Sequence, residues 1–327
     1  MNKLLDILER FKAAHLLVVG DLMLDRFVMG EVERLSPEAP VPVLRVVSED
    51  RRLGGAANVI HNIRTLGGRV TACGVIGNDD AGKRILDFLR RVGASTAGVV
   101  IDRNFQTIQK SRIIASPHHQ QIVRLDRESR EPIHSATLKR LREFILERTE
   151  RCDGMVISDY GKGAVHDELL SALAARLGKR KMICVVDPKK ENFAGYRFPT
   201  LITPNKGEAA DAAGIDIRDD KTLRAAGAKL LRQWRAQGVL ITRGADGMSL
   251  FRPRCEPRHF PTEPRDVFEV TGAGDTVVAV CALVLACGGD FESAAVIANV
   301  AAGFVGDEIG TVAVAFNKLK SKIEELP

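Results

Sequence analysis

The sequence Glu-Val-Thr-Gly-Ala-Gly-Asp-Thr at residues 269–276 leads directly into an unbroken apolar run at 277–287, which predicts a buried helix. The first N–H groups of a helix have no partner within it and lie at the positive end of its dipole, so the small residues 272–274 would expose an anion site. Asp275 in the first turn would repel a resting phosphate but could take a proton from a hydroxyl group that attacks it. The stretch therefore indicates phosphoryl transfer to an alcohol. The alternative is a glycine-rich turn whose acidic residue only favours the helix dipole.

Composition bounds the class of protein. The chain has 327 residues, 45% of them hydrophobic and 28% charged, as in soluble globular proteins. The formal net charge is +6, but the Lys and Arg residues are scattered, and one Trp and two Tyr are too few for the aromatic stacking that single-stranded nucleic acids favour. We therefore expect small anionic molecules as partners, and no nucleic acid.

The cysteines and the N-terminus indicate the compartment. None of the six cysteines has Cys-x-x-Cys spacing, and most lie in apolar runs, which predicts buried thiols in a reducing environment. Residues 1–12 include Asp6 and Glu9 and lack the apolar core of a secretory signal. The apolar run at 277–287 is shorter than the roughly 20 residues that a membrane span needs. We expect a cytoplasmic protein without a membrane partner.

Short apolar runs alternate with helical patterns along the chain. The first run, Leu-Leu-Val-Val-Gly at 16–20, is typical of a strand that a parallel sheet buries on both faces. Further strands are expected at 70–77, 155–158, 182–187, 201–203, 239–242 and 248–251, and helices at 4–11, 135–148, 169–177, 221–237, 294–305 and 314–323. This succession predicts the α/β class, a doubly wound and largely parallel sheet flanked by helices. No linker or repeat interrupts it, so residues 1–327 are expected to form one domain.

Two segments, at about 26–50 and 106–126, break this rhythm. The first is rich in proline, and both contain extended, alternating stretches, which predicts antiparallel strands apart from the main sheet. Together they could form a small β flap, a lid over the site. His118 and His119 have no further ligand at metal spacing, so we expect an exposed hairpin tip there and no metal site.

Polar residues follow the predicted strands. Asp21 and Asp25 come after the first strand, where α/β sheets bind ligands, and are candidates to hydrogen-bond a polyol, with turn and cap roles as the alternative. Gly54 and Gly55 precede a helix whose first turn carries Asn58, which could meet a sugar hydroxyl, although ordinary helix packing is the simpler explanation.

Residues 77–84 nearly match a Walker A loop. Arg84 stands where the magnesium-binding hydroxyl should be, and Asp79 and Asp80 would repel phosphates. We interpret this stretch as a helix start with acidic capping.

Three motifs together resemble the ribokinase/PfkB family of carbohydrate kinases, over essentially the whole chain. They are Gly54-Gly55-x-x-Asn58, Asn205-x-x-Glu208 and Thr271-Gly272-Ala273-Gly274-Asp275. Their order, and their intervals of roughly 150 and 65 residues, are those of the family.

The resemblance implies a ribokinase-like fold, ATP and Mg²⁺ as cofactors, a monovalent cation as a further candidate, and a role for each matching residue. Asp275 would be the catalytic base, and Gly272, Ala273 and Gly274 the anion hole for the γ-phosphate. The implied nucleotide-binding residues are Asn205, Lys206, Gly207, Glu208, Thr242, Gly244, Gly247 and, near the adenine, Asn299; of these, Glu208 would organise Mg²⁺ through water. The implied sugar-binding residues are Asp21, Asp25, Gly54, Gly55 and Asn58.

Longer stretches resemble the branch of the family that phosphorylates D-glycero-β-D-manno-heptose 7-phosphate at O1. These stretches are Gly20-Asp21-x-Met-Leu-Asp25-Arg26, Leu35-Ser-Pro-Glu-Ala-Pro-Val-Pro-Val43, Gly54-Gly-Ala-Ala-Asn58 and Ser158-Asp-Tyr-Gly-Lys-Gly163. The implied pathway leads to ADP-heptose for the lipopolysaccharide core. Lys110, Arg112 and Lys162 are candidates for the 7-phosphate on charge alone. Met23 stands where ribokinase-like members often carry Asn, which argues against ribose-type recognition.

Three further points concern the domain content of the chain, its assembly and the alternative functions. Since the chain ends at Pro327, directly after the kinase part, we expect the form without a nucleotidyltransferase domain. The exposed strand edges of the flap make a homodimer through the lid the expected assembly. The alternatives in function are a kinase of another sugar phosphate or of a nucleoside, and a non-catalytic sugar-phosphate sensor on the same fold.

Overall fold

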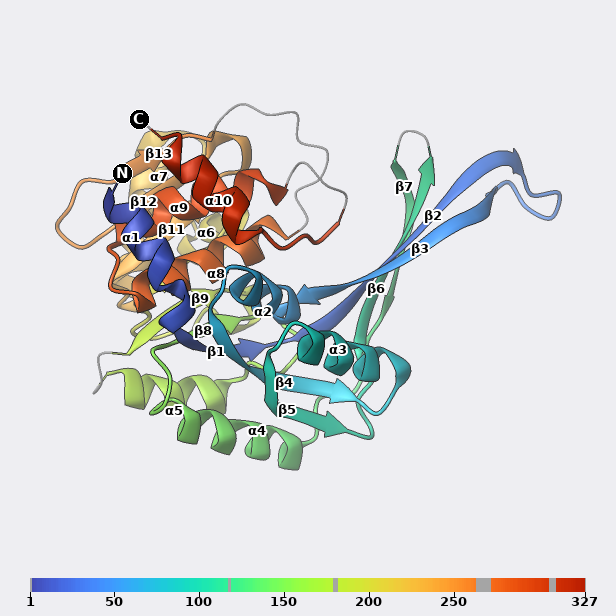
Figure 1. The fold of residues 1–327 in the computed structure, drawn as a ribbon, viewed down its shortest axis with the longest axis horizontal. Helices are drawn as coiled ribbons and strands as arrows, with labels where there is room; N and C mark the ends of the chain where they lie inside the picture. Colours follow the sequence, from blue (N-terminus) through green and yellow to red (C-terminus); the bar gives the residue numbers. More distant parts are fainter. Residues whose placement is uncertain (1, 117–118, 179–181, 263–271, 306–309, 327) are drawn as a thin grey trace.

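The computed structural model describes residues 2–116, 119–178, 182–262, 272–305 and 310–326. Among these residues, nine strands form one large sheet in the order β13-β12-β11-β10-β9-β8-β1-β4-β5 (Figure 1). The parallel strands are β1 (His15–Gly20), β4 (Arg69–Gly77), β5 (Ser95–Asp102), β8 (Gly154–Ser158), β9 (Ile183–Asp187), β10 (Leu201–Ile202) and β11 (Gly238–Thr242). Two antiparallel strands, β12 (Met248–Phe251) and β13 (Arg258–Phe260), complete one edge. The predicted α/β class is confirmed.

Helices cover both faces of this sheet, and the alternation along β1 shows why. Leu16 and Val18 point into one buried cluster, and Leu17 and Val19 into the other. The first cluster includes residues of α1 (Asn2–Arg10), α2 (Ala56–Thr65), α3 (Asp80–Arg91), α8 (Ala273–Ala286), α9 (Phe291–Gly303) and α10 (Phe316–Glu324). The second includes residues of α4 (Ser135–Arg148), α5 (Asp167–Leu177), α6 (Lys206–Ala213) and α7 (Asp220–Trp234). The side chains on both faces of the strand are therefore buried against apolar side chains of the helices, as the continuous apolar runs require.

Helix α8 lies at the centre of the first layer. It contacts α2, α9 and β9, and every residue from 275 to 285 is buried. A helix with apolar residues on all sides has to be buried in this way. This position fixes the beginning of α8, and with it Asp275, at the carboxyl ends of the parallel strands.

A second, four-stranded sheet extends away from the main body, and we call it the small sheet (Figure 1). It has the order β3-β2-β6-β7, with strands β2 (Leu22–Leu35), β3 (Pro42–Gly55), β6 (Ile108–Ser116) and β7 (Gln120–Arg127). The prediction of purely antiparallel strands is wrong, because β2 and β6 pair in parallel. The reason is that β2 follows β1 and β6 follows β5, so both segments leave the same edge of a parallel sheet and run outward together. Only β3 and β7 return, and they pair antiparallel with β2 and β6.

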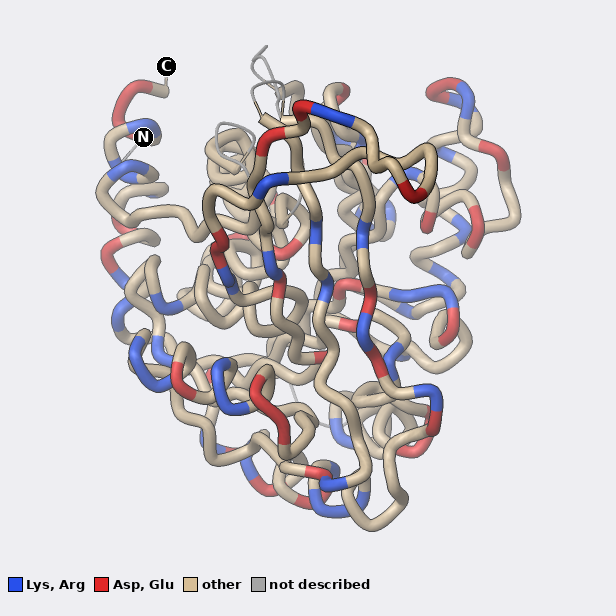
Figure 2. The backbone as a smooth tube through the Cα atoms, turned by 90° about the vertical axis from the view of Figure 1, so that its right-hand side faces the viewer, with Lys and Arg blue, Asp and Glu red and all other residues tan. Residues whose placement is uncertain are grey.

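Charges of both signs alternate along the strands of the small sheet (Figure 2). Ion pairs join Arg26 to Glu49 at 2.7 Å and Arg124 to Asp126 at 2.9 Å, and Arg45 pairs with Glu31. Within the described ranges, no helix combines the length and the hydropathy that a bilayer span requires.

The stretch that nearly matches a Walker A loop begins α3, as expected. The Asp79 carboxylate accepts from the N–H of Gly82 at 2.8 Å, which caps the helix, and from the N–H of Thr107 at 2.8 Å. His118 of the predicted hairpin tip lies outside the described residues, whereas His119 directly precedes β7 with φ 52°. In the part of the chain that the structure describes, no group of three or more His, Cys, Asp or Glu side chains could hold a metal ion.

Candidate active site

The beginning of α8 forms the centre of the site. Gly272 is its N-cap, with φ 90°, a left-handed conformation that favours glycine, and an added Cβ there would lie 2.9 Å from Nδ2 of Asn58. Ala273, Gly274 and Asp275 form the first turn, where backbone N–H groups have no partner within the helix. Thr271 and the rest of the preceding stretch lie outside the described residues. The predicted anion hole and the predicted base therefore occupy one helix terminus.

Two side chains hold the carboxylate of Asp275. Asn58 Nδ2 donates to Oδ2 at 2.9 Å, and the Tyr160 hydroxyl donates to Oδ1 at 2.7 Å. Burial raises the pKa of Asp275 to about 6, although the hydrogen bonds from Asn58 and Tyr160 lower it. A carboxylate with this pKa is ionised at neutral pH and is a better proton acceptor than an ordinary aspartate, as a general base needs to be.

A cavity of about 610 Å³ opens on one side of this helix terminus. It brings together residues that are far apart in the sequence: Ala273 and Gly274, and the predicted nucleotide residues Asn205, Lys206, Gly207, Thr242, Gly244, Gly247 and Asn299. Val277, Met248 and Ala302 add an apolar wall. An apolar cavity with a few polar groups, next to unpaired helix N–H groups, suits a nucleotide with its phosphates at the helix.

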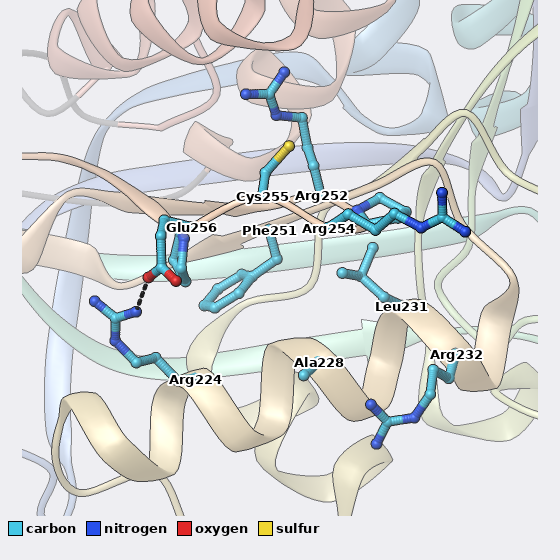
Figure 3. A pocket seen from close by; sticks show the side chains of 11 residues that line it. Arg224, Ala228, Leu231, Arg232, Phe251, Arg252, Arg254, Cys255 and Glu256 are labelled. Atoms are coloured by element: carbon cyan, nitrogen blue, oxygen red, sulfur yellow. Dashed lines mark hydrogen bonds and ion pairs between the residues drawn. The ribbon is translucent and has the colours of Figure 1, made fainter.

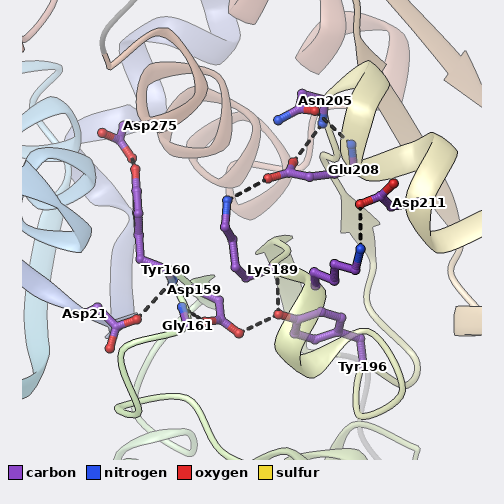
Figure 4. A network of polar contacts seen from close by, with 11 residues as sticks. Asp21, Asp159, Tyr160, Gly161, Lys189, Tyr196, Asn205, Glu208, Asp211 and Asp275 are labelled. Atoms are coloured by element: carbon purple, nitrogen blue, oxygen red, sulfur yellow. Dashed lines mark hydrogen bonds and ion pairs between the residues drawn. The ribbon is translucent and has the colours of Figure 1, made fainter. Parts of the chain in front are cut away.

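Asn205 and Glu208 form a reciprocal capping box at the start of α6. Glu208 N–H donates to Oδ1 of Asn205 at 2.9 Å, Asn205 N–H donates to Oε2 of Glu208 at 3.0 Å, and Lys189 Nζ lies 3.2 Å from Oε1 of Glu208 (Figure 4). Burial and the negative charges of Asp275 and Glu208 raise the pKa of Asp187 well above its usual range. Asp187, at the end of β9, is therefore close enough to Asp275 and Glu208 to interact with their charges.

Two of the predicted sugar-binding residues, Asp21 and Asp25, use their carboxylates in contacts within the protein. Asp25 is 3% exposed and accepts a hydrogen bond from Nη1 of Arg112 at 2.8 Å, so Arg112, a candidate for the 7-phosphate, is occupied by an internal ion pair. Gly54 packs against Asp25, because an added Cβ would lie 2.5 Å from its Oδ2. Asp21 is buried and accepts three backbone N–H groups of the loop after β8. Its carboxylate is thus used to hold a loop.

Two of the basic candidates remain near the site. Lys110 Nζ lies 5.3 Å from the centre of the Tyr160 ring, and burial lowers the pKa of this lysine. Lys162 forms an ion pair with Glu128 at 2.6 Å. Gly55, with φ 54°, caps α2 directly before the turn that carries Asn58.

The sequence profile described as pfkB family carbohydrate kinase matches residues 13–316 of the chain. The chain belongs to this family. Residues of all three predicted motifs lie at this candidate site, around the beginning of α8.

Several curated relatives share the name bifunctional protein HldE. The chain is 46% identical over 299 residues to the bifunctional protein HldE of Geobacter metallireducens, and this alignment covers 91% of this chain and 61% of that protein. It is 41% identical over 317 residues to the bifunctional protein HldE of Desulfatibacillum aliphaticivorans, covering 97% of this chain and 64% of that protein. The kinase thus spans less than two thirds of the length of these relatives.

Solved structures support the fold. Phosphofructokinase-2 from Escherichia coli, in complex with potassium, superposes with a TM-score of 0.78 at 20% identity, covering 94% of this chain and 97% of that one. Arabidopsis thaliana ribokinase, complexed with ribose and ATP, gives 0.73 at 19% identity, covering 96% and 99%. The ribokinase-like architecture expected for the kinase is confirmed.

Three residues of the site were missing from the sequence-based assignment. Tyr160 contacts the predicted base, Lys189 contacts Glu208, and Asp187 lies near both acids. Tyr160 follows the carboxyl end of β8, Asp187 is the last residue of β9 and Lys189 follows it, and this position was a usable signal. The sequence did not indicate which side chains these three residues would contact, because their partners lie in distant segments.

A second cavity, of about 440 Å³, lies between α7 and the turn that connects β12 with β13 (Figure 3). Arg224 forms an ion pair with Glu256 at 2.7 Å, and Arg252 with Glu292 at 2.8 Å. None of the residues predicted for catalysis or nucleotide binding lines it. The cavity beside α8 is therefore the candidate active site.

Proposed function

We propose that this chain transfers the γ-phosphoryl group of ATP to O1 of D-glycero-β-D-manno-heptose 7-phosphate, giving the 1,7-bisphosphate. The observation that carries the proposal is the buried Asp275, held by two hydrogen bonds at a helix N-terminus that opens into the 610 Å³ cavity. The choice of sugar rests on the sequence stretches shared with heptose-phosphate kinases, and identities of 41–46% to proteins named HldE agree with it. The product would lead towards ADP-heptose.

Asp275 accepts the proton of the anomeric hydroxyl as that oxygen attacks the γ-phosphorus in line. The bond from the γ-phosphorus to the β,γ-bridging oxygen breaks, and ADP leaves with that electron pair. The N–H groups at residues 272–274 stabilise the charge on the transferred group. Because the acid has no nucleophilic role, no phospho-enzyme forms.

The site suits Mg²⁺ bound mainly through ATP and water. Glu208 and Asp187 supply hard oxygen atoms, and the mutual repulsion of these acids with Asp275 would be relieved by a cation. Asn205 and Glu208 would hold its water ligands. The ion would neutralise charge on the phosphates when bound.

Lys110 is the best candidate for the 7-phosphate, because among the described residues Arg112 and Lys162 form internal ion pairs whereas none is formed by Lys110, whose ammonium group lies 5.3 Å from the centre of the Tyr160 ring. Lys162, on the same loop as Tyr160, is the second candidate. Arg112 would contribute indirectly, by fixing Asp25.

Purified protein with ATP and Mg²⁺ is expected to turn over heptose 7-phosphate with kcat/KM at least 100-fold above that for ribose, fructose 6-phosphate and adenosine. Lys110→Ala should raise KM for the heptose about 10- to 100-fold, since a charged hydrogen bond contributes about 1.5–3 kcal/mol, and leave KM for ATP unchanged. Coupled ADP release measures both, with and without potassium to test the monovalent cation. Preference for another acceptor would replace the substrate, and turnover of none would favour the sensor.

We further infer that the chain forms one kinase domain and works in the cytoplasm. In this domain the small sheet acts as the lid over the site, and it pairs with a second copy of the chain. Register places Val32, Val46, Val123 and Leu125 on one face of that sheet, opposite the face of Asp25, Lys110 and Arg112. Each of these four apolar side chains is 37–53% exposed. All six cysteines are free thiols, which fits a reducing compartment.

Leu125→Asp should therefore convert a dimer into monomers of 35.7 kDa, because a charge would be buried in the apolar contact. Sedimentation velocity measures the mass. Ile101→Asp is the matched control, since Ile101 is 50% exposed on β5 of the main sheet. A monomeric wild type, or a dimeric Leu125→Asp variant, would contradict the inferred contact.

A further inference from the structure

The loop after β8 is tied down by two buried carboxylates, Asp21 directly after β1 and Asp159 from the loop itself. Asp21 accepts from the N–H groups of Tyr160 at 2.9 Å, Lys162 at 3.1 Å and Ala164 at 3.1 Å. Asp159 accepts from the N–H of Gly161 at 2.7 Å (Figure 4). Such a loop has little freedom, because most of its backbone donors have fixed acceptors.

Tyr160 projects from this loop to the reaction centre. Its hydroxyl reaches Oδ1 of Asp275 at 2.7 Å, and Figure 4 shows the phenol extended directly between the loop and the acid. The other oxygen of Asp275 is held by Asn58, from α2. A carboxylate has about four lone-pair sites, so each oxygen keeps one for a substrate hydroxyl.

We propose that Tyr160 is the positioning residue of the reaction: its hydroxyl, anchored through the loop to Asp21, orients the Asp275 carboxylate towards the acceptor and keeps it ionised. The inference rests on the proposed function, in which Asp275 is the base. Tyr160 itself takes no proton. It acts on the acceptor only through Asp275.

The charges around Asp275 agree with this role. Burial and Asp25 raise the pKa of Asp275, whereas Asn58, Tyr160 and Lys110 lower it. Asp187 is a further acid close enough to interact. Burial and the charge of Asp275 raise the pKa of Tyr160 well above its ordinary value, so the phenol stays a donor throughout the working range. Removing this donor should shift the balance towards protonated Asp275.

The test compares the only two tyrosines of the chain. Tyr160→Phe keeps the ring beside Lys110 and removes the hydroxyl. Tyr196→Phe removes a buried hydroxyl, which donates to Asp159 at 2.5 Å and does not touch Asp275. We expect Tyr160→Phe to move the acid limb of the kcat profile up by about one pH unit, as expected for a lost hydrogen bond to the charged form. At pH 7 kcat should fall about tenfold, of which the smaller ionised fraction of Asp275 accounts for about twofold and its lost orientation for the rest. KM for ATP should not change, and Tyr196→Phe should leave the acid limb in place.

An acid limb that stays in place in Tyr160→Phe would overturn the proposal, as would an equal shift in Tyr196→Phe, which would indicate general loosening. A direct readout separates this outcome from failure of the proposed function. The carboxyl carbon of Asp275, assigned in ¹³C NMR by its loss in Asp275→Asn, should titrate at higher pH in Tyr160→Phe even if the wild type phosphorylates no tested acceptor. An unchanged titration of that carbon overturns the proposal whatever the substrate.

Discussion

Replacing Asp275 with asparagine is expected to lower kcat by about 10²–10⁴-fold, the usual contribution of a general base. An amide of the same shape cannot take the proton of the acceptor hydroxyl. The cavity for the nucleotide is lined by the backbone of Ala273 and Gly274 and by residues of other elements, so ATP binding should persist within a few-fold. Turnover of the acceptor and calorimetric titration of ATP measure the two effects.

The same substitution should make the protein more stable at neutral pH. Burial raises the pKa of Asp275 from 3.8 to about 6. Between these values the unfolded chain loses the proton while the folded protein keeps it, so wild-type stability falls as pH rises through this window and then stays level for this group. The variant lacks this cost, which is at most about 3 kcal/mol. Its advantage in urea unfolding should therefore grow from pH 4 to pH 6 and change little above.

Asp211→Asn is the matched control for both measurements. Asp211 lies on α6, its side chain is 54% exposed, and it pairs with Lys190 at the surface. This variant should keep wild-type turnover and stability. Normal turnover in Asp275→Asn would remove Asp275 from the role of base.

The second large effect concerns the buried pair of Asp25 and Arg112. Arg112→Met should lower the free energy of unfolding by about 3–5 kcal/mol, because it leaves the Asp25 carboxylate buried without its partner. Both residues are less than 10% exposed, and the guanidinium also lies 5.3 Å from the centre of the Phe27 ring. Urea unfolding without substrate measures the loss.

The double variant Asp25→Asn/Arg112→Met should recover at least half of that loss, since no unpaired charge remains. Arg124→Met is the matched single control: Arg124 lies beside Arg112 on the neighbouring strand, and its ion pair with Asp126 is exposed, so the change should cost less than about 1 kcal/mol. Equal stability of Arg112→Met and the wild type would show that Arg112 is free to serve the substrate alone.

The succession of strands and helices was predictable because each buried strand is a short apolar run. Ser95–Asp102 and Arg258–Phe260 are the exceptions: they contain small or polar residues and lie at the two edges of the main sheet, where only one neighbouring strand constrains the sequence. The parallel pairing of β2 with β6 depends on where both segments leave the main sheet. The alternation of apolar and polar residues within each segment does not indicate whether the two strands pair in parallel or antiparallel.

The motifs at residues 205–208 and 272–275 both lie at helix starts, one as a capping box and the other as a start with small residues, and the roles that the resemblance implies for them stay predictions. The partners of single polar residues were beyond reach. Tyr160 and Asp275 are 115 positions apart, and Arg112 and Asp25 are 87 apart. A lone basic residue in a sequence carries the same charge whether it will meet a substrate phosphate or an internal aspartate. Only the fold decides between these, and here it assigned Arg112 to Asp25.

The most direct test of the central claim is ³¹P NMR of the reaction of the wild-type protein with ATP, Mg²⁺ and D-glycero-β-D-manno-heptose 7-phosphate. Transfer to O1 predicts a new phosphorus resonance that is coupled to the anomeric proton and grows in step with ADP, while the 7-phosphate resonance persists. Formation of ADP without this resonance, or a new phosphate coupled to a different sugar proton, would contradict the proposed reaction.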